Sequence, residues 1–244
     1  MTESVPRPLP AARRADGGPH PGALAVVTAV LFVASVVVAV AATGGSGAAL
    51  PVGASVHDVA SRYADHPEGF RVSALLGFGA SVPLAILAAT VYTRQRRLGI
   101  RVPGPAIGLV GGVLASALLA VSMLATWTAS QDGVPDDDAV ARALALLAFA
   151  TGGVGFAVGL GLLVAGAAVP ALILRLVPRW LAWVGLVLAA VAEVSFLSLV
   201  VEPLQYLLPV ARFGGLLWLV AYGFLVPRTR HQVAGRDVGG RADA

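Results

Sequence analysis

WLAWVGLVLAAVAEVSFLSLVV, residues 180–201, is an apolar run that decides the fold class. A helix of about 20 apolar residues crosses the hydrocarbon core of a bilayer, so this run is long enough to span a membrane. One carboxylate, Glu193, lies near its middle, and no other Asp, Glu, Lys or His lies so deep in an apolar run. A charge at the bilayer centre costs about 3 kcal/mol or more. The surrounding residues must therefore neutralise Glu193 or use it.

The composition of the whole chain also indicates a protein that lies in a membrane. The 244 residues are 57% hydrophobic and only 12% charged, with a mean hydropathy of +0.84, whereas about 25% of the residues in a soluble domain are charged. All 17 residues of the Lys and Arg class are Arg, and they cluster at the ends of apolar runs, which indicates membrane topology rather than nucleic-acid binding. The chain has no Cys, which excludes disulfides, thiolate metal sites and Cys nucleophiles.

The pattern of apolar runs predicts an all-α polytopic transmembrane bundle of six helices, with the lipid bilayer as its main partner. The tails at 1–21 and 227–244 are polar and are predicted to be disordered in the cytoplasm. The first run could also belong to a signal peptide cleaved after residue 41. Its apolar run of about 20 residues exceeds the usual 7–15, which favours an uncleaved anchor. The predicted spans are at about 22–43, 71–93, 105–128, 145–174, 180–201 and 205–226.

The distribution of arginines sets the orientation. With both termini in the cytoplasm, 13 arginines lie on the cytoplasmic side and four are left for the outer half, as the excess of basic residues on the inner side requires. Most acidic residues lie in the predicted outer loops. The sequence therefore predicts outer loops at 44–70 and 129–140, a short outer turn at Glu202 and Pro203, and cytoplasmic turns rich in arginine.

The first outer loop contains a predicted amphipathic helix with Ser55 as its N-cap. His57 and His66 could bind a metal ion or sense pH, but they are nine residues apart and lie on opposite sides of one helix. The second outer loop holds the acidic run 136–138, which is typical of a solvated surface. We therefore predict no metal site and no cofactor.

Helix packing in lipid depends on close contact, because lipid is as apolar as leucine. Small residues four apart predict contacts between helices of one chain, and a homo-oligomer interface is the alternative. Pro83 and Pro170 are expected to kink their helices and to free a carbonyl in the preceding turn. The small residues that we expect at these contacts are Gly104, Gly108, Gly112, Gly155, Gly159, Gly185 and Ala189.

Glu193 and Arg212 are the intramembrane polar candidates. Glu193 lies ten residues before Pro203 and Arg212 nine after it, so at a rise of 1.5 Å per residue both are about 14–15 Å below the turn. Antiparallel neighbours would place them at one depth, which predicts a buried Glu193–Arg212 ion pair. The alternatives are a protonatable carboxylate in a transport path, or a neutral Glu193 bonded to a hydroxyl or a backbone carbonyl.

Motifs for catalysis are not found in the sequence. No apolar run contains His or Asp, and neither HExxH nor a Walker motif occurs. We therefore predict no catalytic residues and a protein that is not an enzyme. The first hypothesis is a structural or regulatory membrane protein held together by the Glu193–Arg212 pair. The second is a small proton- or cation-coupled transporter that uses Glu193.

The segments FATGGVGFAVGLGLLVAGAAVPALILRLVPRWLAWVGLVLAAVAEVSFLSL, residues 149–199, and RFGGLLWLVAYGFLVPR, residues 212–228, carry a family likeness. With them the chain, over about 22–228, resembles uncharacterised bacterial multipass membrane proteins similar to the DUF4386 family, a domain of unknown function. The resemblance implies a helical multipass fold in a bacterial inner membrane. It implies no activity and offers no catalytic residues.

Overall fold

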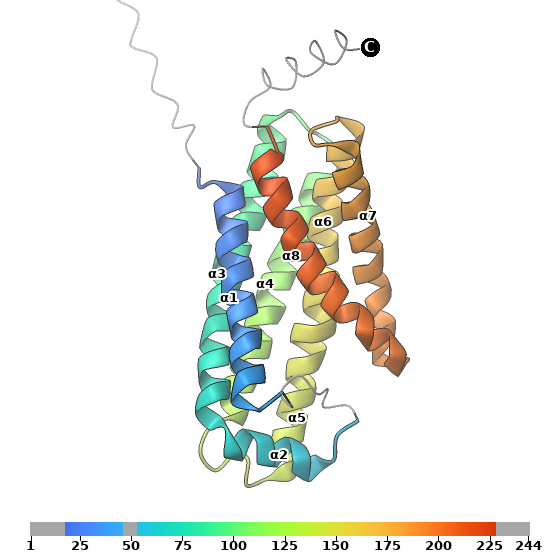
Figure 1. Ribbon diagram of the computed structural model, residues 1–244. Helices are drawn as coiled ribbons and strands as arrows, with labels where there is room; N and C mark the ends of the chain where they lie inside the picture. Colours follow the sequence, from blue (N-terminus) through green and yellow to red (C-terminus); the bar gives the residue numbers. More distant parts are fainter. Residues whose placement is uncertain (1–17, 46–52, 228–244) are drawn as a thin grey trace, which may run out of the picture.

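The structure is a computed structural model that describes residues 18–45 and 53–227 (Figure 1). Every regular element in these ranges is helical. Six helical segments are long and apolar enough to cross a membrane, which confirms the six-helix bundle and a multipass membrane protein. No membrane is part of the structure, so the prediction that both termini are cytoplasmic stays a prediction. Nearly all of the predicted tails, 1–21 and 227–244, lie outside the described residues.

The membrane-spanning segments begin and end within four residues of the predicted positions, except at the start of the fourth, which lies at Asp138 rather than at residue 145. The second span is longer than predicted because α3 begins at Pro67, directly after α2 (Val56–Asp65). The fourth is a continuous helical segment of 36 residues, Asp138–Ile173. The other spans are α1 (Pro21–Ala42), α4 (Gly104–Ala129), α7 (Arg179–Val194) with η3 (Ser195–Leu199), and η4 (Glu202–Tyr206) with α8 (Leu207–Leu225).

The long fourth span is divided by a turn of π-helix. It consists of α5 (Asp138–Phe149), the π-helical η2 (Ala150–Gly155) and α6 (Phe156–Ile173). A π turn inside an α-helix is frequently found at a functional site. The sequence predicted a tilt or an exit at the outer end of this span. In the structure the segment is helical from Asp138 onward, and α5 packs against both α4 and α2.

Helices that follow one another in sequence pack side by side. Contacts join α1 to α3, α3 to α4, α4 to α6 and α6 to α7, and α8 closes the bundle against α1, α6 and α7. Figure 1 shows α2 lying across one end of the bundle, whereas the described ends of the chain, near α1 and α8, lie at the other end. We refer to these as the α2 end and the terminal end.

The contact between α4 and α6 depends on glycine. A Cβ added to Gly166 would lie 2.4 Å from the backbone nitrogen of Gly108, and one added to Gly159 would lie 2.7 Å from that of Ala115. Such backbone approach supplies the close packing on which helix association in lipid depends. Gly104 lies against Pro170, Gly112 against Ala88, Gly155 against Leu118 and Gly185 against Trp218, and Ala189 is buried.

Pro170 shows how a freed carbonyl is satisfied inside the bundle. A proline cannot donate to the carbonyl four residues before it, which here belongs to Gly166. The amide nitrogen of Gln95, on α3, donates to Gly166 O over 3.3 Å and also to the hydroxyl of Tyr222 over 3.2 Å. One buried side chain therefore ties α3, α6 and α8 together near the terminal end.

Candidate functional site: a cavity beside the π turn

A cavity of about 470 Å³ lies in the half of the bundle nearer α2. Its walls come from α1, α2, α3, α4, the α5–η2 segment and the η4–α8 segment. Figure 1 shows that α1 and α8 lie side by side near the terminal end and diverge toward the α2 end, where the residues that line the cavity are found. This volume falls in the range of small-molecule sites, roughly 300–1,000 Å³.

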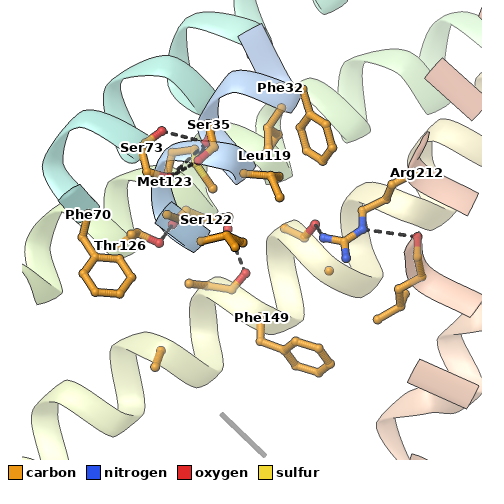
Figure 2. Close-up of a pocket in the computed structure, with 18 of the residues that line it drawn as sticks. Phe32, Ser35, Phe70, Ser73, Leu119, Ser122, Met123, Thr126, Phe149 and Arg212 are labelled. Atoms are coloured by element: carbon orange, nitrogen blue, oxygen red, sulfur yellow. Dashed lines mark hydrogen bonds between the residues drawn. The ribbon is translucent and has the colours of Figure 1, made fainter. Parts of the chain in front are cut away.

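Most of the wall is apolar. Figure 2 shows Phe32 from α1, Leu119 from α4 and Phe149 from α5. They lie around the space between the Ser35 and Ser73 side chains on one side and Arg212 on the other. Phe32 also contacts the ring of Phe213 on α8, with 5.6 Å between the ring centroids. The body of any molecule in this cavity would therefore contact aromatic and aliphatic side chains.

The serine and threonine hydroxyls of the cavity already donate to protein atoms. Ser35 Oγ donates to the carbonyl of Ser73 over 2.8 Å, and Ser73 Oγ donates back to the carbonyl of Ser35 over 2.8 Å, which joins α1 to α3. Ser122 Oγ donates to Ala148 O, and Thr126 Oγ1 donates to Ser122 O within its own helix. Each of these hydroxyls donates its proton to a backbone carbonyl, so none of them offers a free donor to a ligand.

Arg212 has hydrogen-bond donors that the protein does not use. Its Nε donates to Leu208 O over 3.3 Å and its Nη1 to Gly152 O over 3.4 Å. A guanidinium carries five N–H donors, and the other three meet no acceptor in the described parts of the chain. The lining of the cavity includes no Asp or Glu. A positive charge with open donors therefore lies in an apolar cavity.

The π turn positions this charge. Gly152 belongs to η2, and a Cβ on it would lie 2.1 Å from Ser122 Oγ, so only glycine brings the turn this close to α4. The π geometry leaves carbonyls to be satisfied by side chains, and Ser122 and Arg212 donate to those of Ala148 and Gly152. The run ATGGVG, residues 150–155, is the signal in the sequence, because two adjacent glycines interrupt an otherwise apolar helix.

Helix α2 covers the cavity at its end of the bundle. Arg62 and Tyr63 line the cavity, and the ring of Tyr63 packs on that of Phe70 with 4.5 Å between centroids. Burial raises the pKa of Tyr63 to about 12. The predicted N-cap is confirmed, because Ser55 Oγ accepts a hydrogen bond from the backbone N–H of Asp58 over 3.1 Å.

Contacts with α5 hold α2 in this position. Arg142 donates to the carbonyl of Ala54, just before α2, and His57 Nδ1 lies 3.4 Å from a carboxylate oxygen of Asp138. Within the described ranges, no group of three or more His, Cys, Asp or Glu residues could hold a metal ion. Asp138 is instead half-buried beside His57, and Asp132 pairs with Arg71 at 2.7 Å.

The predicted Glu193–Arg212 ion pair is not formed. The two ion pairs found in the described residues involve neither side chain. Glu193 lies one residue before the end of α7 and does not line the cavity. Its buried Oε1 has no hydrogen-bond partner in the described part of the chain, and a Cβ on Gly161 would lie 3.2 Å from it.

Glu193 and Arg212 do not pair because their side chains lie against different helices. The predicted depths of the two residues assumed a tight turn between α-helices that rise 1.5 Å per residue. The chain instead passes through η3 and η4, which are 3₁₀-helices and rise about 2.0 Å per residue. These five-residue segments lie on both sides of the turn and change the rise on each side alike. What separates the two groups is direction, because Glu193 lies against Gly161 of α6 and Arg212 reaches Gly152 of η2.

Comparison of the chain with models of protein families, with curated proteins and with solved structures finds no match. The resemblance to the DUF4386 family therefore rests on the sequence pattern alone.

Proposed function

We propose that this membrane protein binds a small organic anion in the cavity, with the guanidinium of Arg212 holding the negative group. The observation that carries the proposal is the set of open donors of Arg212 in a cavity lined without acidic residues. Hydrogen bonds between arginine and a carboxylate or phosphate are charge-assisted and frequently bidentate, so they give both strength and orientation. The apolar wall would hold the body of the ligand.

This proposal replaces the two roles that the sequence assigned to Glu193. A structural role for the Glu193–Arg212 pair has no support in the geometry, because the pair is not formed. A transporter that uses Glu193 would need a path to that carboxylate, and Glu193 does not line the cavity. The expectation that the chain is not an enzyme stays a prediction, and the proposal assigns binding and no reaction.

Benzoate is a suitable first probe, because it combines one carboxylate with an apolar ring. We expect it to bind the purified full chain in nanodiscs, and Arg212→Gln to weaken binding tenfold or more. A hydrogen bond to a charged group contributes about 1.5–3 kcal/mol, and 1.4 kcal/mol is a factor of ten. Arg212→Lys should bind with intermediate affinity, because lysine keeps the charge but loses the fork of donors. Isothermal titration calorimetry measures all three constants.

The matched control is Arg179→Gln, which removes an exposed arginine at the start of α7, away from the cavity. It should bind benzoate like the parent. Thermal unfolding without ligand shows whether Arg212→Gln is folded, and Arg212→Lys carries the test if it is not. The proposal is wrong if the parent does not bind benzoate, or if replacing Arg212 changes binding no more than replacing Arg179.

A further inference from the structure

The cavity reaches the surface of the bundle between α1 and α8. Phe213 and Tyr206 both line the cavity, yet they are 39% and 82% exposed. On the facing helix, Val36 and Val40, one turn apart, line the cavity and are half-buried. The Phe32–Phe213 ring contact lies on the terminal-end side of this opening. We call the opening bordered by Val36, Val40, Tyr206 and Phe213 the portal.

The residues around the portal indicate which solvent it faces. Val33 and Val37 on α1 and Val210 and Leu217 on α8 are exposed and apolar, at 42%, 57%, 51% and 70%. Both helices belong to segments long and apolar enough to span a membrane. Exposed apolar side chains on such helices face lipid. The portal therefore opens toward acyl chains along the side of the bundle.

We propose that the ligand is a single-chain carboxylate amphiphile, of the fatty-acid class, that enters from the bilayer through the portal. This inference rests on the proposed function and names the ligand of the same site. The carboxylate is held by Arg212, and the chain lies along the apolar wall and leaves between α1 and α8.

Two features of the cavity favour this ligand class. At about 470 Å³ the cavity lies toward the lower end of the range of small-molecule sites, which suits one chain rather than the two of a phospholipid. The hydroxyls at the far side from Arg212, those of Ser35 and Ser73, donate to backbone carbonyls. A second polar group on the ligand would find no free hydroxyl donor from these residues, whereas a hydrocarbon chain needs none.

Closing the portal tests the inference separately from the anion site. Val40→Trp places a large ring at the portal without touching Arg212, and Val37→Trp puts the same ring on a lipid-facing position of α1 that does not line the cavity. The probes are palmitate and its methyl ester in nanodiscs of neutral phosphatidylcholine, and benzoate added from water. The readout is the ligand concentration that half-saturates the rise in unfolding temperature.

We expect palmitate to stabilise the parent and the methyl ester to need at least a tenfold higher concentration. Val40→Trp should weaken palmitate at least tenfold, while Val37→Trp binds it like the parent. Benzoate binding by Val37→Trp should match the parent, which shows that an added ring on α1 leaves the anion site intact. The inference is overturned if palmitate does not bind while benzoate does, or if the two tryptophan variants bind palmitate equally. If the parent does not bind benzoate, the proposed function itself is overturned.

Discussion

Gly166 allows α4 and α6 to pack with their backbones in contact, because it has no Cβ atom. Its missing Cβ would lie 2.4 Å from Gly108 N and 2.5 Å from Gly104 O, both of them backbone atoms that cannot rotate away. Real Cβ atoms essentially never approach other atoms so closely. The position therefore requires glycine for packing, although the backbone there is ordinary α-helix.

Gly166→Ala should lower the stability of the bundle, because the new methyl group forces α4 and α6 apart. Overpacking of this kind costs about 1–3 kcal/mol. Gly79→Ala is the matched control, since the nearest atom to its added Cβ is Leu31 Cδ1 at 3.9 Å. Thermal unfolding in detergent compares them, and equal unfolding temperatures would show that α4 and α6 are not packed as described.

At the scale of elements, α2 covers the cavity because its apolar face packs down on the bundle. Val59, Ala60 and Tyr63 are its buried residues, and Arg142 and Asp138 of α5 hold its beginning. The sequence predicted this helix from its apolar face and its serine cap. It did not predict what lies beneath, because the neighbours of the apolar face come from α3 and α5.

The ionisation of Tyr63 reports whether α2 is docked. Burial raises its pKa from 10.0 to about 12, so the folded state favours the neutral phenol. The stability that this contact contributes is complete below pH 10 and is lost as the pH rises toward 12. The difference in tyrosinate absorbance between the parent and Tyr63→Phe should titrate near pH 12. A midpoint near pH 10 would mean that Tyr63 is not buried under α2.

At the scale of the whole molecule, the sequence predicted the fold because span length and hydrophobicity are properties of each segment alone. The same reasoning located Arg212 as an intramembrane charge but paired it with Glu193. That pairing considered depth alone, whereas in the structure Glu193 lies against Gly161 of α6 and Arg212 reaches Gly152 of η2. The cavity could not be predicted, because its walls come from five of the six spans and from α2, and no single segment encodes their arrangement.

The central claim is that an anionic amphiphile binds inside the bundle at Arg212. The most direct measurement is photo-crosslinking with a fatty acid that carries a diazirine near its carboxylate, followed by peptide mapping of the full chain in nanodiscs. The account predicts crosslinks on η2 and the first turns of α8, and their loss in Arg212→Gln but not in Arg179→Gln. Crosslinks spread over lipid-facing residues such as Val187 and Leu217, unchanged by Arg212→Gln, would contradict it.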